Sequence, residues 1–306
     1  MSARDPPLSP IRHPIPESFR GERSHICNAR RPLKGKALIA IMRSLRARRI
    51  RMTSFASEEK LSARPRHRII RNATMKTSIG TSGFQYAEWK GNFYPEDLAA
   101  AKMLPYFAER LSTTEINYTF HRVPSPKTIE NWKAQTPENF RFALKAPQKI
   151  THFAKLRDCQ DTLDYFCRVI LQLGDRLGPV LFQLPPQFKK NAEVLNSFLR
   201  ELPAIRAAFE FRHASWFDEE IFDLLKTRNI ALCLADTEKL AASTEITADY
   251  GYLRLRREDY TSADVTRWAE FIRQQADRWQ EAFVYFKHEE AGIGPKLARQ
   301  MIDLLG

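Results

Sequence analysis

Short apolar runs alternate with longer stretches of helical periodicity from residue 75 to the end of the chain. The runs are apolar through their centres, as strands buried on both faces are. Strands that alternate with helices form a parallel sheet. The pattern therefore predicts eight strands, which are Thr77–Thr81, Thr114–Tyr118, Phe140–Lys145, Val180–Gln183, Ala207–Phe211, Ala231–Ala235, Tyr252–Leu255 and Ala282–Phe286.

Helical segments lie between these runs, and several carry start signals. Asp218 places a carboxylate at a helix N-terminus, Ser262 offers an N-cap, and Pro295 suits the first helical position. The connection from residue 236 to residue 251 is weakly patterned and is expected to hold a short helix at most. The predicted helices are Leu98–Leu111, Thr128–Gln135, Gln160–Leu173, Ala192–Leu202, Asp218–Arg228, Ser262–Gln280 and Pro295–Leu305.

Eight strand–helix units in ~230 residues match the size of a (β/α)₈ TIM-like barrel. We therefore predict one barrel domain over residues 75–306. The main alternative is an open doubly wound sheet, which usually carries G-x-G-x-x-G after its first strand. Here that turn reads Gly80-Thr-Ser-Gly83, which is neither this fingerprint nor a P-loop.

The positive charge of the chain is concentrated before the predicted barrel. Residues 1–74 contain 18 Lys and Arg and 5 Asp and Glu, which accounts for the whole formal net charge of +13. This composition predicts a disordered basic tail. The tail could be an artefact of start-site choice, since Met75 directly precedes the first strand, or 36–52 could form a basic amphipathic helix that contacts nucleic acid or a membrane. The barrel itself is neutral, so nucleic acid is not its expected partner.

The four cysteines show no zinc-finger or C-x-x-C spacing, and no apolar run approaches the 18 or so residues of a membrane span. No secretory signal is recognisable in the first residues. These features predict a reduced, cytoplasmic protein without a membrane anchor.

Five segments of the barrel region form an ordered set of motifs. They are Ile79-Gly-Thr-Ser-Gly-Phe-Gln-Tyr-Ala-Glu-Trp-Lys-Gly-Asn-Phe-Tyr-Pro95, Glu115-Ile-Asn-Tyr-Thr-Phe120, Phe142-Ala-Leu-Lys-Ala-Pro147 with Thr151-His152, Leu181-Phe-Gln-Leu-Pro-Pro186, and Glu210-Phe-Arg-His-Ala-Ser-Trp216. Together they resemble the family called domain of unknown function 72, the YecE-like proteins. The resemblance covers essentially all of residues 75–306.

The resemblance implies a (β/α)₈-like barrel and no particular reaction. Two segments depart from the family pattern. Leu255-Arg-Arg257 stands where many members have His-Gly after the seventh strand, and Phe286-Lys-His-Glu289 stands where many have an Asn-rich segment. Ligand contacts in these two loops cannot be carried over from the family.

Polar side chains stand at or just beyond the ends of the predicted strands, where the active sites of such barrels form. Among them, Glu115, Glu210 and Lys145 are the candidate catalytic residues. Residues expected to bind the substrate are Thr81, Ser82, Asn117, His152, Gln183, Arg212, Trp216 and Asp236.

The chemistry of these side chains suggests roles. Glu115 and Glu210 could form a general acid and base pair with pKa values split by unequal burial. Lys145 and Arg212 could hold an anionic group, and Lys145 could instead form a Schiff base if burial lowers its pKa. The competing interpretation is a structural ring of ion pairs in which Lys145 or Arg212 neutralises a glutamate.

The strand-end residues and one loop suggest two further ligands. Glu115, Glu210, Asp236 and His152 could hold Mg²⁺ or Mn²⁺, although their spacing matches no metal motif and no cofactor is indicated. The loop Gly292-Ile-Gly294-Pro295 could bind phosphate through backbone amides before the last helix.

Two functional classes follow. The first is a small-molecule enzyme that acts on an anionic or polyhydroxyl substrate at the carboxyl end of the barrel. The second is a non-catalytic binding or interaction module, associated with nucleic acid through the basic tail, in which the charges at the strand ends are structural.

Overall fold

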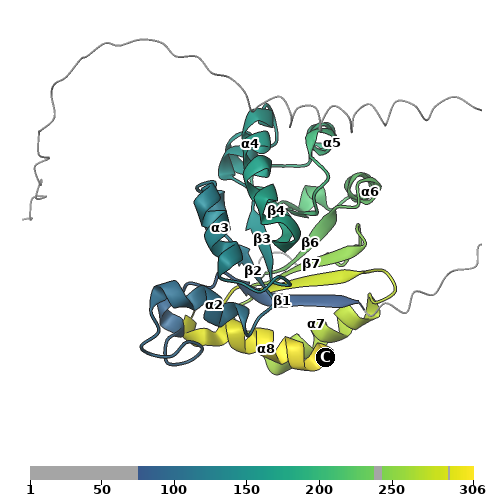
Figure 1. Ribbon diagram of the computed structural model, residues 1–306. Helices are drawn as coiled ribbons and strands as arrows, with labels where there is room; N and C mark the ends of the chain where they lie inside the picture. Colours follow the sequence, from purple (N-terminus) through teal and green to yellow (C-terminus); the bar gives the residue numbers. More distant parts are fainter. Residues whose placement is uncertain (1–74, 238–242, 289) are drawn as a thin grey trace, which may run out of the picture. The chain divides into compact units, whose positions relative to one another are not determined.

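The computed structural model describes residues 75–237, 243–288 and 290–306. Eight parallel strands close into a barrel in the order β1 to β8, with β8 paired to β1 (Figure 1). The predicted fold class is confirmed. The strands are β1 Lys76–Ser82, β2 Thr113–Ile116, β3 Arg141–Lys145, β4 Leu177–Gln183, β5 Ala207–Glu210, β6 Ala231–Asp236, β7 Tyr250–Leu255 and β8 Glu281–Phe286.

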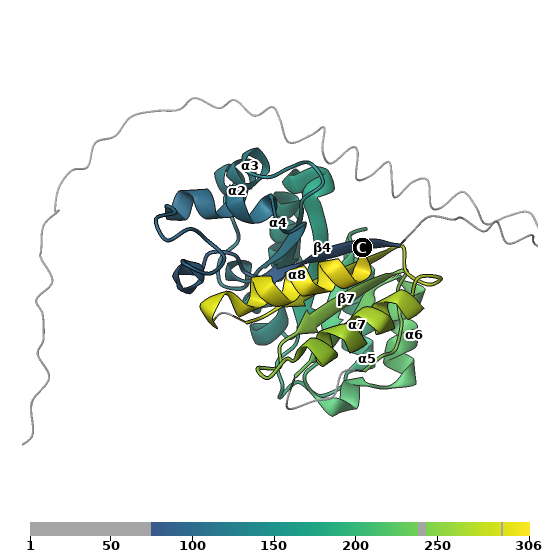
Figure 2. The same cartoon turned by 90° about the horizontal axis from the view of Figure 1, so that it is seen from below.

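Helices cover the outside of the barrel. In Figure 1, α8 begins on the side where the strands end and runs back to the side where they begin, and Figure 2 shows α7 and α8 packed side by side. The α-helices are α2 Met103–Ala108, α3 Pro126–Ala134, α4 Gln160–Ile170, α5 Ala192–Glu201, α6 Glu219–Thr227, α7 Ser262–Gln274 and α8 Ile293–Leu305. None of the described helices is long and apolar enough to cross a membrane.

Helix starts follow the capping signals with small shifts. Asp218, predicted as the first residue of a helix, is the N-cap of α6 and accepts a hydrogen bond from the backbone of Glu220. The N-cap of α7 is Thr261 rather than Ser262, because Thr261 and Asp264 form a reciprocal capping box. The last helix starts at Ile293, two residues before the predicted Pro295, with Gly292 in a left-handed conformation at its N-cap.

Two predicted strands are longer than the observed ones at their carboxyl ends. The second strand ends at Ile116 because Asn117 has a helical backbone and precedes a 3₁₀ turn, Tyr118–Phe120. The fifth strand ends at Glu210, before the predicted Phe211. The described part of the connection between β6 and β7 contains no helix. The predicted tail, residues 1–74, lies outside the described residues.

Side chains of the strands point alternately into the barrel and toward the helices. The outward side chains pack with the helices into the larger hydrophobic core. The inward side chains form a second core, composed of Ala143, Leu181, Ala208, Ala231, Cys233, Tyr250, Tyr252, Phe283 and Tyr285. Alanine, leucine and cysteine side chains on β3 to β6 therefore face tyrosine and phenylalanine rings on β7 and β8 across the interior.

This alternation decides which strand-end residues reach the mouth of the barrel. Lys145 lies two residues beyond the inward Ala143, and Glu210 lies two residues beyond the inward Ala208. Arg254 likewise follows the inward Tyr252. All three side chains are thus directed into the barrel at its carboxyl end.

Candidate active site at the carboxyl end of the barrel

Glu115, at the end of β2, is fully buried and accepts four hydrogen bonds. The Oγ of Ser82 donates at 2.6 Å and the hydroxyl of Tyr252 at 2.7 Å. Arg254 donates from Nε to one carboxylate oxygen at 2.8 Å and from NH2 to the other at 2.7 Å. Every strong acceptor position of this carboxylate therefore has a donor from the barrel itself.

Glu210, at the end of β5, is held in the same way from the opposite side of Arg254. The NH1 group of Arg254 donates to one of its oxygens. The other oxygen accepts from Gln183 Nε2 at 2.8 Å and from Arg212 Nε at 2.9 Å. Arg254 thus bridges two buried carboxylates, and its own side chain is only 3% exposed.

This bridge sets the protonation of both glutamates. Burial is the largest single influence and raises the pKa of each carboxyl, but the charge of Arg254 and the other charged and hydrogen-bonding partners together leave both pKa values below the usual 4.5. The sequence predicted pKa values split between an acid and a base. The structure instead gives two ionised carboxylates, because one arginine reaches both.

Lys145, at the end of β3, faces the mouth as expected but does not form the ion pair with Glu115 or Glu210 that a structural ring of ion pairs would require. Within the described residues its ammonium forms no ion pair, and it lies 4.0 Å from the centre of the Phe120 ring. Burial first, and then the charge of Arg254, lower the pKa of Lys145 to about 8. Arg254 already occupies Glu115 and Glu210, so Lys145 remains an unneutralised cation at the mouth.

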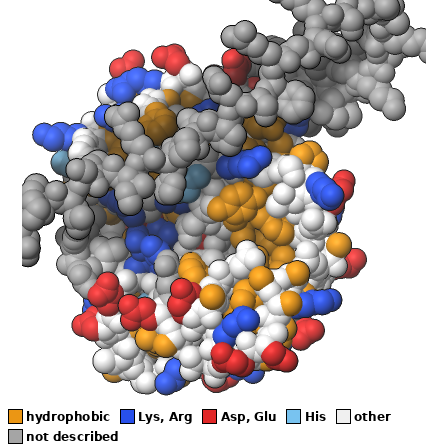
Figure 3. Space-filling view, turned by 90° about the vertical axis from the view of Figure 1, so that its left-hand side faces the viewer, with side chains coloured by type: hydrophobic (Ala, Val, Ile, Leu, Met, Phe, Trp, Pro, Cys, Tyr) orange, Lys and Arg blue, Asp and Glu red, His pale blue; other side chains and the backbone are white. Residues whose placement is uncertain are grey.

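Two further arginines stand beside Glu210. Arg212 is 33% exposed and Arg256 is 21% exposed, so both are more accessible than Arg254. Arg256 NH1 lies 3.8 Å from Glu210, and its buried Nε has no hydrogen-bond partner. Figure 3 views this end of the barrel; where grey atoms do not cover it, Lys and Arg side chains gather beside a hollow near its centre.

The smaller polar residues form a supporting layer. Asn117 Nδ2 donates to Ser82 Oγ at 2.7 Å, and Ser82 in turn donates to Glu115. His152 lies on a π-helical turn, with its Nδ1 3.0 Å from Thr151 Oγ1 and its ring 4.8 Å from that of Phe120. Burial and the nearby Lys145 lower the pKa of His152, which favours its neutral form.

The structure separates Thr81 and Asp236 from this cluster. In each case a neighbour in the strand takes the inward position. Thr81 donates to the Gly83 carbonyl at 2.5 Å and lies against α8, whereas Ser82 points inward. Asp236 accepts from Tyr260 at 2.5 Å and from Trp268 on α7 at 3.2 Å, so it faces the helices. Their position at the end of a strand predicted that both would reach the mouth. Successive side chains of a strand point in opposite directions, and these two point toward the helices.

Trp216 is also not part of the cluster. Its side chain is buried and stacks on Phe211 with ring centres 4.8 Å apart, and its Nε1 donates to the Phe188 carbonyl at 2.6 Å. A large apolar ring near the rim finds more contact area under the 3₁₀ turn Ala214–Trp216 than in solvent. It packs the loop and offers no surface to a ligand.

The sequence places Arg254 among the polar residues at the strand ends but indicates no role for it, and it does not single out Arg256 as a site residue. Their signal is an alternation in β7, where Tyr250, Tyr252, Arg254 and Arg256 share one face and leucines stand between the last three. Strands of a parallel barrel are normally apolar on both faces, so two arginines on the inward face require partners there.

The residues considered for a divalent metal do not assemble. Arg254 and other donors already bond the carboxylate oxygens of Glu115 and Glu210, and Asp236 faces outward. Within the described residues no group of three or more His, Cys, Asp and Glu side chains converges. The donors present at the mouth suit an anion better than a cation.

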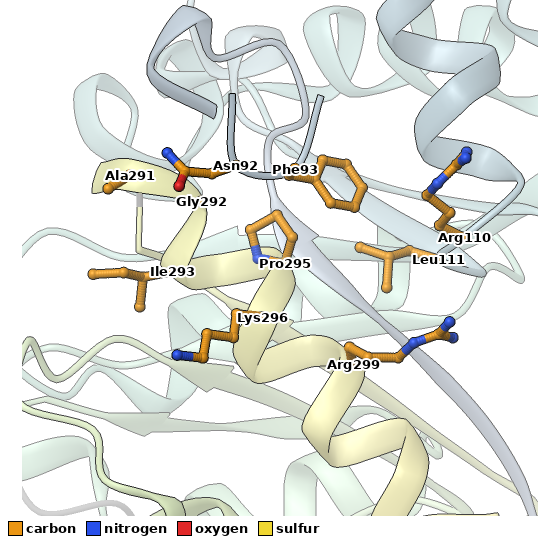
Figure 4. Close-up of a pocket in the computed structure, with 10 residues that line it drawn as sticks. All are labelled: Asn92, Phe93, Arg110, Leu111, Ala291, Gly292, Ile293, Pro295, Lys296 and Arg299. Carbon is orange, nitrogen blue, oxygen red and sulfur yellow. The ribbon is translucent and has the colours of Figure 1, made fainter. Parts of the chain in front are cut away.

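The predicted phosphate loop at residues 292–295 lies outside the barrel. A cavity of about 510 Å³ opens there between Asn92 and Phe93, the end of the α2 region and the start of α8 (Figure 4). The Gly294 N–H already donates to the His288 carbonyl at 3.3 Å, and Pro295 has no N–H. Two backbone donors that a phosphate would use are therefore missing from this turn.

Comparison with known proteins gives a consistent family. A family model described as "Protein of unknown function DUF72" matches residues 78–306. The UPF0759 protein YecE of Escherichia coli is 34% identical over 116 residues, which are 37% of this chain and 43% of that protein, so the match spans less than half of the relative. The UPF0759 protein YunF of Bacillus subtilis is 22% identical over 257 residues, 70% of this chain and 90% of YunF.

Solved structures agree with the fold. A DUF72 family protein of Thermotoga maritima superposes with a TM-score of 0.68 at 27% identity, covering 75% of this chain and 99% of the other. A DUF72 family protein of Enterococcus faecalis superposes with a TM-score of 0.63 at 17% identity, covering 76% and 98%. With the ordered motifs and the closed barrel, these matches show that the chain belongs to the DUF72 family.

Proposed function

We propose that this protein is an enzyme that binds a small anionic molecule in the carboxyl-end mouth of the barrel and uses Lys145 to transfer a proton. One observation carries the proposal. Arg254 bonds both buried carboxylates, Arg212 and Arg256 are left to share one oxygen of Glu210, and Lys145 forms no ion pair within the described residues. An anionic ligand would supply the missing negative charge.

The electrostatics of the mouth favour this ligand class over a neutral polyol. Burial weakens the hydration of the cations, so that each gains more from a counter-charge than it would in water. The pKa of Lys145 and that of Arg256 are both lowered, by burial first and then by the charge of Arg254. A bound anion would raise both pKa values again, because it would stabilise the charged forms of Lys145 and Arg256.

Lys145 is the group best suited to chemistry. A base or acid works best when its pKa lies near the working pH, and the pKa of Lys145 is lowered to about 8. Glu115 and Glu210 are assigned a different role from the one the sequence suggested. As ionised partners of Arg254 they position its guanidinium and set the charge of the mouth.

Calorimetric titration tests the binding. The wild-type chain is titrated with small anions, such as phosphate esters and carboxylates, and with neutral polyols of matching size. Anions should bind and polyols should not, and Arg212→Gln should weaken anion binding at least tenfold, about 1.4 kcal/mol. The exposed Arg200 on α5 provides a matched control, since Arg200→Gln removes the same charge far from the mouth.

Proton transfer is tested on the anions that bind. Each is incubated with the protein in D₂O and followed by NMR for exchange of carbon-bound hydrogen. Exchange that is lost in Lys145→Met supports an enzyme. Tight binding with no change in any bound anion would instead favour the non-catalytic binding module, and equal binding of anions and polyols would contradict the proposal.

A further inference from the structure

Arg212 and Arg256 approach the same oxygen of Glu210 from two strands. Arg212 Nε donates to Oε1 at 2.9 Å, and Arg256 NH1 lies 3.8 Å from that atom. The first follows the end of β5, and the second follows the end of β7. The two guanidinium groups are thus neighbours at the mouth, although their residues lie 44 positions apart in the chain.

Most of the donors of this pair are unused. Within the described residues, Arg212 donates only through Nε, and the guanidinium of Arg256 makes no hydrogen bond at all. Arg254 differs, because Nε, NH1 and NH2 each donate to a carboxylate. An arginine that is two thirds or more covered and still lacks acceptors is poised to receive them from a ligand.

The charges at the mouth indicate how much negative charge the ligand brings. Among the described residues that form this network, Lys145, Arg212, Arg254 and Arg256 contribute four positive charges, and Glu115 and Glu210 contribute two negative ones. Within this group the excess is two positive charges. A dianion neutralises this excess, whereas a monocarboxylate leaves one charge unmatched.

We propose that Arg212 and Arg256 form a two-arginine clamp for the phosphate group of a small phosphate monoester. Guanidinium groups pair with tetrahedral oxyanions through two parallel N–H···O bonds, which a lysine cannot reproduce. A phosphate offers three terminal oxygens, enough for both arginines, and Lys145 at the end of β3 is left for the rest of the substrate. This inference rests on the proposed anion-binding function and adds the substrate class.

The test uses isothermal titration of the full chain with three probes: glycerol 3-phosphate, succinate and acetate. The variants are Arg256→Lys, Arg256→Gln and Arg212→Gln, with Arg200→Gln as the matched control. Glycerol 3-phosphate should bind best, and each of the three clamp variants should weaken it at least tenfold. Arg256→Lys is the informative variant, since it keeps the charge and removes the fork.

A pH series provides a second readout that a purely structural role would not produce. The second ionisation of a phosphate monoester has a pKa of about 6, so its affinity should rise between pH 5 and pH 7 as the dianion forms. Succinate ionises at lower pH and should show a weaker rise. Circular dichroism of each variant establishes that lost binding is not lost folding.

The outcomes separate this inference from the function on which it rests. Binding of glycerol 3-phosphate that depends on Arg212 but is unchanged in both Arg256 variants would overturn the clamp and leave an anion site in place. Acetate binding as tightly as the phosphate ester would overturn the substrate class. If none of the three anions binds, the proposed function fails and the clamp fails with it.

Discussion

The ammonium of Lys145 lies 4.0 Å from the centre of the Phe120 ring, while neither neighbouring glutamate pairs with it. The ring face provides a weak electrostatic partner that leaves the Nζ atom able to lose a proton. A carboxylate partner would instead raise the pKa of the lysine. Burial and the charge of Arg254 lower the pKa of Lys145, and no ion pair with a carboxylate reverses this shift.

The lowered pKa of Lys145 predicts how stability depends on pH. The pKa is about 8 in the folded protein and 10.5 as the reference, so between these values the unfolded chain binds more protons and stability rises with pH. Below pH 8 the lysine is protonated in both states, and the folded protein carries the full free-energy cost of burying this charge. Lys145→Met should therefore increase the free energy of unfolding at pH 7 by about 1–3 kcal/mol, and the gain should shrink toward pH 10.

Urea unfolding at pH 7, 8.5 and 10 measures this difference. Lys127→Met, at an exposed position on α3, is the matched control and should show no such trend. A Lys145→Met protein that is less stable than the wild type at pH 7 would show that the lysine is a stabilising structural cation.

Removing Arg254 should be far more damaging than removing Arg212. Arg254→Met leaves two buried carboxylates without their shared partner, which should cost about 3–5 kcal/mol of folding free energy. Arg212 is partly exposed, and Arg212→Gln should cost no more than about 1 kcal/mol. Urea unfolding at pH 7 provides the comparison, and equal losses in the two variants would refute the assignment of Arg254 as the central bridge.

Acid should weaken the fold through the same bridge. A carboxyl whose pKa is lowered by folding stabilises the native state above its unfolded pKa and loses this contribution as the pH falls below it. With an unfolded value near 4.5, Glu210 should contribute at pH 7 and progressively less below pH 4.5. Glu210→Gln should therefore be less stable at pH 7 and show a shallower loss between pH 5 and pH 3.

Thermal melts across this pH range test the prediction. Glu130→Gln, at an exposed position on α3, controls for the loss of one charge. The prediction fails if wild type and Glu210→Gln lose stability in parallel on acidification.

Gly80 should tolerate no side chain. A Cβ atom at this position would lie 1.7 Å from the carbonyl oxygen of Thr113 on the neighbouring strand. Since the obstacle is backbone, β1 and β2 would have to separate, and we expect Gly80→Ala to cost more than about 3 kcal/mol or to prevent folding. Gly174, where a Cβ atom would meet nothing within 4 Å, is the comparison: Gly174→Ala is strained by its positive φ alone and should cost less than Gly80→Ala.

The sequence alone was enough to predict the barrel. A parallel barrel buries both faces of every strand, so each of the eight strands requires a continuous apolar run in the sequence. The sequence also indicated the end of the barrel at which a site is expected, since active sites of such barrels form where the strands end. Ser82, Asn117, Gln183 and Arg212 were selected on this basis, and the structure brings them into one network with the two glutamates.

The tertiary structure decided which strand-end residues share that network and how they are charged. Thr81 and Asp236 stand at strand ends but face the helices, because a shift of one residue reverses the direction of a side chain in a strand. Arg254, and not Lys145, pairs with both glutamates. This pairing requires the ends of β2, β5 and β7 to lie close together across the barrel interior. These residues are far apart in the sequence, so the sequence does not give the distances between their charged groups. The closed barrel sets these distances and thereby decides that Arg254, and not Lys145, pairs with the two glutamates.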